Sequence, residues 1–184
     1  MRGNRFSRWI GRLGLRVLGG WKVVGEMPDL KKAIVPVAPH TSNWDFFVGI
    51  FAMLALGLRL SFLGKHQIFV FPVKRVLTWL GGIPVNRASP HGVVGDITAV
   101  FAERDSLILA LSPEGTRKKV EKWRTGFLYM ARDAKVPVVP VALDFSQREI
   151  RIGQPIEVNE NVEAGLAAVQ KFTCQARGKV PEYE

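Results

Sequence analysis

The sequence contains little cysteine and no apolar run long enough to cross a membrane. Cys174 is the single cysteine among 184 residues, and one thiol can form neither an internal disulfide nor a cysteine-based zinc site. A reducing compartment is therefore expected. The three histidines, His40, His66 and His91, have no close metal-ligand spacing, so no metal site is predicted. The apolar run from 46 to 58 is shorter than the roughly 20 residues that span a bilayer.

Acidic side chains are also scarce, and residues 1–25 contain none. Over the whole chain 26 lysines and arginines outnumber 16 aspartates and glutamates, which gives a formal net charge of +10. Such an excess calls for an anionic partner, and nucleic acid, anionic lipid and acidic protein are the candidates. Aromatic residues interleaved with the basic ones, as needed to stack nucleic-acid bases, are sparse outside the N-terminal helix, so no nucleic-acid partner is predicted.

The N-terminal segment, residues 1–25, has the pattern of a helix that lies in a membrane interface. Two stripes run along residues 5–18 at helical spacing, one apolar and the other basic. The alternatives are a basic helix packed on the protein's own core and a processed leader. A secretory signal is not expected, because arginines interrupt any apolar stretch. The apolar stripe comprises Phe6, Trp9, Ile10, Leu13 and Val17, and the basic stripe Arg5, Arg8, Arg12 and Arg16.

Residues 26–184 alternate short apolar runs with helix-forming ones, as in one α/β domain. Hydrophobic residues make up 47% and charged residues 23% of the chain, which is normal for a globular protein. Several runs are wholly apolar, as in strands buried on both faces, which predicts a mixed, largely parallel central sheet with helices on both faces. Strands are expected at 34–39, 60–63, 83–85, 107–111, 136–143 and 149–158, and helices at 5–18, 46–58, 72–80, 92–104, 126–134 and 162–172.

His40 and Asp45 stand out where the strand at 34–39 gives way to a helix. Five residues on one helix lie about 140° apart around its axis, so the two side chains meet only if the helix begins between them. Thr41, Ser42 and Asn43 are all good N-cap residues. Asp45 can then hold one ring nitrogen of His40 and leave the other as a general base. Ordinary helix capping beside a satisfied histidine is the alternative interpretation.

Two more strands are followed by polar residues with a cation. Asn86 and Arg87 follow the strand at 83–85, and a turn containing Glu114, Gly115, Thr116 and Arg117 follows the strand at 107–111. If these strands are parallel, the groups converge on one edge of the sheet. The planar fork of arginine suits phosphate, and backbone N–H groups around Gly115 suit phosphate or a developing oxyanion. No covalent nucleophile stands beside the base, which favours direct attack by a substrate hydroxyl. Solvated surface charge is the alternative for each arginine.

Four blocks together resemble the glycerolipid acyltransferase family that includes bacterial 1-acylglycerol-3-phosphate acyltransferases. Each block is weak alone, but their order along residues 34–145 matches the family, so each supplies context for the others. The blocks are His40-x4-Asp45, Gly81-Gly82-Ile83-Pro84-Val85-Asn86-Arg87, Pro113-Glu114-Gly115-Thr116-Arg117 and Val136-Pro137-Val138-Val139-Pro140-Val141.

The resemblance implies transfer of a fatty acyl group from acyl-CoA or acyl carrier protein to a lysophospholipid hydroxyl, with phosphatidic acid as the leading product. His40 would be the general base and Asp45 its orienting partner. Arg87 and the turn from Glu114 to Arg117 would bind the acceptor's phosphate, and the block around Pro140 would shape the substrate pocket. No metal or cofactor is implied beyond the acyl donor itself.

The chain also departs from the family pattern. Asn86 stands where many members have an acidic residue, so another lysolipid is an alternative acceptor. The chain is short for the family and has no unambiguous spanning helix, which predicts a peripheral or monotopic protein on the cytoplasmic face of an anionic membrane. Residues 26–184 would form the acyltransferase domain. A non-catalytic lipid-binding protein is the alternative from another class.

Overall fold

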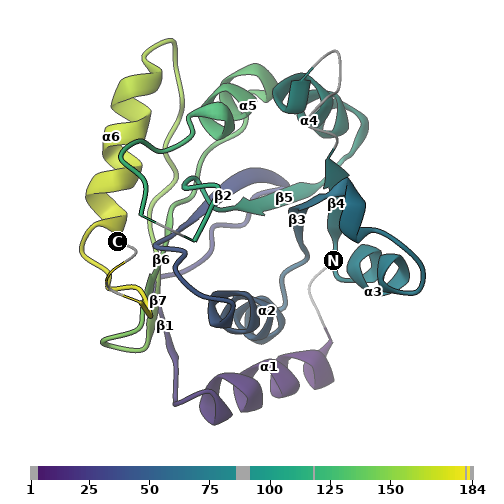
Figure 1. The fold of residues 1–184 in the computed structure, drawn as a ribbon, viewed down its shortest axis with the longest axis vertical. Coiled ribbons are helices and arrows are strands. Elements are labelled where there is room, and N and C mark those ends of the chain that lie inside the picture. Colours follow the sequence, from purple (N-terminus) through teal and green to yellow (C-terminus); the bar gives the residue numbers. More distant parts are fainter. Residues whose placement is uncertain (1–3, 86–91, 118, 181, 183–184) are drawn as a thin grey trace.

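A mixed sheet forms the centre of the structure (Figure 1). The computed structural model describes residues 4–85, 92–117, 119–180 and 182. Within them lie the strands β1 (Lys22–Val24), β2 (Lys32–Ala38), β3 (Leu60–Lys65), β4 (Gly82–Val85), β5 (Leu107–Leu111), β6 (Val141–Asp144) and β7 (Glu149–Ile152). They pair in the order β1-β7-β6-β2-β5-β3-β4. Strands β2 to β6 are parallel, whereas β7 is antiparallel to β6 and parallel to β1.

Helices cover both faces of this sheet. They are α1 (Arg5–Val17), α2 (Trp44–Leu56), α3 (Val73–Trp79), α4 (Gly92–Glu103), α5 (Gly126–Ala134) and α6 (Val162–Thr173), with a short 3-10 helix, η1, at His66–Ile68. Helices α1 and α2 lie on one face, and α4, α5 and α6 lie on the other (Figure 1). Helix α3 lies at the edge of the sheet beside β4. The predicted α/β architecture is confirmed.

The central strand β2 is buried on both faces, which explains its wholly apolar sequence. Ile34 packs with Phe101 and Leu128 on the side of α4 and α5. Its neighbour Val35 packs with Val48 on the side of α1 and α2. Because successive side chains of a strand point to opposite faces, each residue of β2 serves one of the two cores in turn.

The strand predicted at 136–143 is paired as a strand only from Val141 onwards. Proline has no N–H to donate to a neighbouring strand, and the run contains Pro137 and Pro140. Between them, Val138 forms only isolated bridges with Ile34 and Ile156. Strand β6 therefore begins directly after Pro140, and a strand start is one of the three positions, with an edge and a bulge, that these prolines suit.

Strand β1 was not predicted from the sequence. It has three residues, Lys22–Val24, which is too short for a recognisable alternation of apolar and polar side chains. It pairs in parallel with Glu149, Ile150 and Arg151 of β7. The segment 1–25 therefore contributes a strand to the sheet as well as helix α1.

Helix α1 packs on α2 and keeps an aromatic face exposed. A Cβ at Gly11 would lie 2.2 Å from the backbone nitrogen of Ala55, so glycine permits the close approach of the two helices. The opposite side is unpartnered within the described residues, with exposed side chains at Phe6, Trp9, Leu13 and Val17. Thus α1 has one packed side and one apolar surface. In the parts of the chain that the structure describes, no helix is long and apolar enough to cross a membrane.

Candidate active site

The carboxyl ends of neighbouring parallel strands bring two of the predicted polar segments together. Strand β2 leads to His40, and β5 leads to the turn that contains Glu114. These strands pair directly, with Ile34 opposite Leu109. Strand β4 runs in the same direction and leads toward Arg87, which lies outside the described residues.

His40 and Asp45 form a hydrogen-bonded pair at the end of β2. The strand ends at Ala38 and α2 begins at Trp44, so the helix begins between the two residues as predicted. His40 Nδ1 lies 2.9 Å from Asp45 Oδ2, and the Nδ1–H donates to that oxygen. With Nδ1 held in this way, Nε2 is the ring nitrogen left to exchange a proton with a substrate.

The Asp45 carboxylate also holds the turn that precedes α2. The residue is only 4% exposed, and its Oδ2 accepts a hydrogen bond of 2.9 Å from the backbone N–H of Ser42. Asn43, one of the expected N-cap residues, makes no side-chain cap hydrogen bond. Ser42 Oγ instead accepts from the backbone N–H of Trp44 at 3.2 Å. Asp45 Oδ1 is buried and has no hydrogen-bond partner among the described residues.

Glu114 supports the backbone of His40. Its two carboxylate oxygens accept from the His40 backbone N–H at 2.9 and 3.2 Å, and Ser112 Oγ donates to Oε2 at 3.2 Å. Burial raises the pKa of Glu114, and the hydrogen bonds from His40 and Ser112 oppose this rise. Substrate binding by Glu114 stays a prediction, but the structure reveals a positioning contact that the sequence did not indicate.

The turn after β5 is shaped by Gly115 and covered by Arg124. Gly115 has φ of 68°, and a Cβ there would lie 2.6 Å from Arg124 Nε, so this position suits glycine. Its N–H donates to the carbonyl of Ser112 at 3.3 Å and so serves the turn itself. Thr116 and Arg117 are exposed on the same turn. Arg117 is therefore placed to meet a ligand from solvent.

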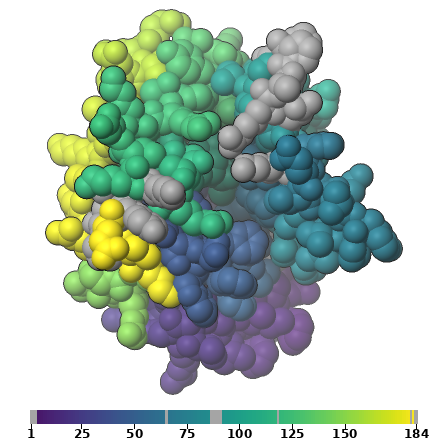
Figure 2. All heavy atoms as spheres, in the orientation of Figure 1, coloured from purple at the N-terminus to yellow at the C-terminus, as the bar shows by residue number. Residues whose placement is uncertain are grey.

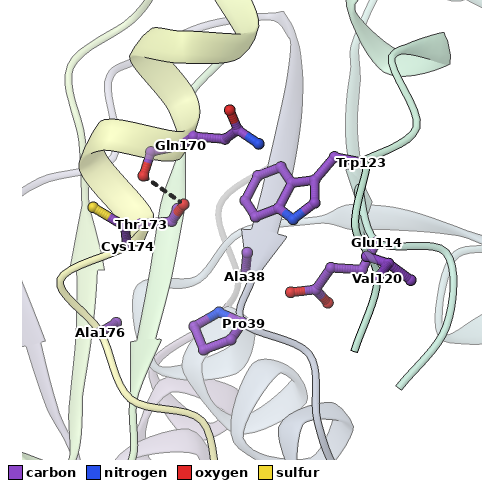
Figure 3. Close-up of a pocket in the computed structure, with 9 residues that line it drawn as sticks. All are labelled: Ala38, Pro39, Glu114, Val120, Trp123, Gln170, Thr173, Cys174 and Ala176. Carbon is purple, nitrogen blue, oxygen red and sulfur yellow. Dashed lines mark hydrogen bonds between the residues drawn. The ribbon is translucent and has the colours of Figure 1, made fainter. Parts of the chain in front are cut away.

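A cavity of about 390 Å³ lies beside Glu114 and Pro39, the residue before His40. Figure 3 shows it between the loop that carries Val120 and Trp123 and the C-terminal end of α6. The wall formed by α6 and the residues after it consists of Gln170, Thr173, Cys174 and Ala176. No sequence pattern indicated this wall, because α6 follows the site residues by more than 40 positions.

The segment after α6 is attached to the turn between His40 and Asp45. The backbone N–H of Val180 donates to Thr41 Oγ1 at 3.1 Å, and Thr41 is only 3% exposed. Beside this contact, Lys179 Nζ lies 4.3 Å from the centre of the Trp44 ring. We call residues 174–180 the C-terminal strap. The strap and α2 hold the turn from two sides.

The role of Pro140 in shaping a substrate pocket stays a prediction. The residue is buried directly before β6, where its carbonyl accepts from the backbone N–H of Gly153 at 2.8 Å. It does not line the cavity beside Glu114. Among the described residues, no three histidine, cysteine, aspartate or glutamate side chains are grouped so that they could hold a metal ion.

Comparison with known proteins identifies relatives of the chain. A family model described as Acyltransferase matches residues 21–144, which include His40, Asp45 and the turn from Glu114 to Arg117. The 1-acyl-sn-glycerol-3-phosphate acyltransferase of Haemophilus influenzae is 28% identical over 158 residues, 80% of this chain and 63% of that protein. The enzyme of the same name from Escherichia coli is 26% identical over 159 residues, 81% of this chain and 62% of that protein. The chain thus spans about three fifths of the length of these relatives.

A solved structure has the same fold. The crystal structure of the 1-acyl-sn-glycerophosphate acyltransferase from Thermotoga maritima matches with a TM-score of 0.62 and 21% identity, over 96% of this chain and 81% of that one. The family match covers two thirds of the chain and includes both strand-end segments that form the site. The chain therefore belongs to the Acyltransferase family.

Proposed function

We propose that the protein transfers a fatty acyl group from acyl-CoA or acyl carrier protein to the hydroxyl of 1-acylglycerol-3-phosphate, giving phosphatidic acid. The observation that carries this proposal is the 2.9 Å contact between His40 Nδ1 and Asp45 Oδ2. The names of the bacterial relatives, both 1-acyl-sn-glycerol-3-phosphate acyltransferases, support the choice of acceptor.

In the proposed reaction His40 acts as a general base. Nε2 takes the proton from the acceptor hydroxyl while its oxygen attacks the carbonyl carbon of the thioester. The tetrahedral intermediate then collapses, the carbon–sulfur bond breaks, and the thiolate of the donor receives the proton from His40. Asp45 keeps the ring oriented and stabilises the imidazolium that forms between the two steps.

Charge and space around this pair suit the proposed substrates. Arg117 is exposed on the turn next to His40, and a guanidinium can hold an acceptor phosphate through two parallel hydrogen bonds. Arg87 is proposed to share this role. We assign the cavity beside Glu114 to part of the substrates, because it is bounded by the residue that precedes His40.

An anionic membrane surface is the proposed partner of α1. Its exposed rings at Phe6 and Trp9 and its exposed cations at Arg5 and Arg12 suit the headgroup layer. We place this contact on the cytoplasmic face, in agreement with a chain that has one cysteine and needs no oxidising compartment.

Thiol release from a long-chain acyl-CoA, with and without lysophosphatidic acid, tests the proposal. Release that requires the acceptor, with phosphatidic acid detected by mass spectrometry, is the expected result. His40→Ala should lower turnover by about 10²–10⁴-fold, as for the loss of a general base. The matched control is His66→Ala, because His66 is exposed on η1 and contributes nothing to the proposed site.

The single thiol of Cys174 adds at most one equivalent to the thiol signal and is subtracted with the enzyme-only blank. A His40→Ala variant within a few-fold of wild type would remove the general-base assignment. Activity with a different lysolipid alone would correct the acceptor. Silence with all lysolipids and with both acyl-CoA and acyl carrier protein donors would favour a non-catalytic lipid-binding protein.

A further inference from the structure

A cluster of exposed apolar side chains surrounds helix α3, far along the chain from α1. Single exposed apolar residues are ordinary, but here they gather within residues 68–79. Phe71 and Trp79 are each 82% exposed, which is more than any described aromatic side chain of α1. We call this cluster the α3 patch; it comprises Ile68, Val70, Phe71, Val73, Val76 and Trp79.

The α3 patch lies at the rim of the molecule. Helix α3 stands beside β4, the last strand of the sheet. Figure 2 shows the blue segment that contains α2 above purple α1, with the blue-teal segment that contains α3 to its right. Trp44 and Phe47 in the first turn of α2 are exposed, and Phe46 packs edge-on against Phe62 of β3 at 5.8 Å between ring centres. Aromatic side chains therefore extend over neighbouring elements from α1 toward α3.

The electrostatic character of this region identifies the partner. No aspartate or glutamate occurs in the sequence between Asp45 and Asp96, and Lys74 and Arg75 are exposed on α3 itself. Basic side chains next to exposed tryptophan and phenylalanine match the headgroup layer of an anionic bilayer. A second copy of the chain is disfavoured as the occupant, because each copy carries a net charge of +10 and two such surfaces repel.

We propose that the α3 patch is a second membrane-contact element, which places the rings of Phe71 and Trp79 in the headgroup layer of an anionic membrane. Helix α2, which carries Asp45 in its first turn, packs on α1 and contacts β3, the neighbour of β4, through Phe46. Contact at both α1 and α3 fixes how the His40–Asp45 turn faces the lipid. This inference extends the membrane partner assigned under Proposed function, but it rests on other residues and its test needs no catalysis.

The test compares binding to vesicles of phosphatidylglycerol and phosphatidylcholine by flotation. Phe71→Glu/Trp79→Glu should lower the partition coefficient by about tenfold or more, because two rings placed in the headgroup layer are replaced by two negative charges that the anionic lipid repels. The matched control is Tyr129→Glu on α5, an exposed aromatic residue on the other side of the sheet. It should bind as wild type does.

A second readout reports the position of the ring directly. Brominated phospholipids should quench wild-type tryptophan fluorescence more than that of Trp79→Phe, and the difference measures lipid contact at Trp79. Equal flotation of the double glutamate variant and wild type, or equal quenching with and without Trp79, would overturn the proposal. The proposal would also be overturned if wild type formed a dimer without lipid and the double variant did not, because a second copy of the chain would then cover the α3 patch. Trp79 quenching in a protein with no transferase activity would refute the proposed function and leave this inference standing.

Discussion

The residues of the site form a short chain of contacts that ends at the His40 ring. Asp45 holds Nδ1 at 2.9 Å, while Glu114 holds the backbone N–H of the same residue at 2.9 Å. One carboxylate therefore orients the ring and the other fixes the main chain from which the ring extends. The two members of the pair also differ in exposure. Asp45 is buried, whereas the His40 side chain is 26% exposed and accessible to a substrate.

At the scale of the residue, Asp45→Asn tests the contribution of the Asp45 carboxylate to catalysis. The amide fits the same space, but it no longer stabilises the imidazolium or enforces the Nδ1–H tautomer. We expect kcat to fall by about 10²–10⁴-fold while the KM for the acceptor changes little. Steady-state kinetics on both substrates measures this, with Asp133→Asn on α5 as the control. An unchanged kcat for Asp45→Asn would show that the pair is only a helix cap.

Glu114 predicts a pH dependence of stability. Burial raises its pKa above the ordinary value of 4.5, so the folded state binds this proton more tightly than the unfolded state does. The stabilisation is complete below the ordinary pKa and is lost as the pH rises through the raised one. In wild type, the free energy of unfolding should therefore fall as the pH rises from the ordinary pKa of Glu114 through its raised pKa. Glu114→Gln should not show this fall. Urea titrations across the pH range measure it, and parallel curves for the two proteins would contradict the assignment.

At the scale of elements, the turn between β2 and α2 is held by segments that are distant in sequence. The C-terminal strap binds it through Val180 and Thr41, and the loop after β5 binds it through Glu114. Helix α1 lies on the side of α2 away from the sheet (Figure 1) and keeps an apolar surface exposed. Segments that are distant in sequence thus support the turn that carries His40.

The strap contact is tested by Thr41→Val. Valine keeps the shape but removes the acceptor for the Val180 N–H, which should cost about 1 kcal/mol of stability, as for one intramolecular hydrogen bond. The turn then loses one of its supports, so kcat should fall several-fold, and Thr41→Ser should restore it. Thermal unfolding and kinetics measured on the same samples check both effects. A Thr41→Val variant that is less stable but fully active would make the strap purely structural.

The charge of α1 is tested by Arg12→Gln/Arg16→Gln. Each basic residue near an anionic surface contributes about 1 kcal/mol, so loss of two should weaken vesicle binding by roughly 30-fold. Added salt should weaken wild-type binding and reduce the difference between the proteins. The control is Arg132→Gln/Lys171→Gln, which removes the same charge from α5 and α6. Equal vesicle binding by the two double variants would show that the loss of binding depends on net charge alone and not on the position of the charges on α1.

At the scale of the molecule, the parallel strands β2 and β5 bring His40 and the Glu114 turn to one edge of the sheet, and the net charge of +10 suits the proposed anionic partners. The cavity beside Glu114 exists only because α6, late in the chain, packs near the loop after β5 (Figure 3). The family match ends at residue 144, so this wall belongs to a part of the chain that the match does not include.

Cys174 makes the cavity testable in the whole molecule, since it lines the cavity and is the single cysteine of the chain. Alkylation with a bulky maleimide should lower acyl transfer several-fold, because the label occupies space assigned to substrate. Cys174→Ala should retain activity and be insensitive to the reagent. Full labelling confirmed by mass spectrometry, with turnover unchanged, would show that substrates lie elsewhere.

Local sequence by itself determined the elements and the principal pair. The apolar runs predicted β2, β3, β4 and β5 close to their observed positions and β6 and β7 in part, and the turn residues between His40 and Asp45 predicted where α2 begins. These features depend on side-chain periodicity and on the geometry of a few consecutive residues, which the sequence displays directly. The prolines at 137 and 140 indicated only that they do not lie in the middle of a strand.

Only the tertiary structure decided which distant groups support that pair. Glu114 and His40 are 74 positions apart, and Val180 and Thr41 are 139 apart. Whether such groups meet depends on strand order, register and the packing of α6, none of which any local pattern encodes. The same holds for strand β1, whose three residues are a strand only because β7 offers them hydrogen-bond partners. The α3 patch is decided in this way too, because exposure is a property of the packed molecule.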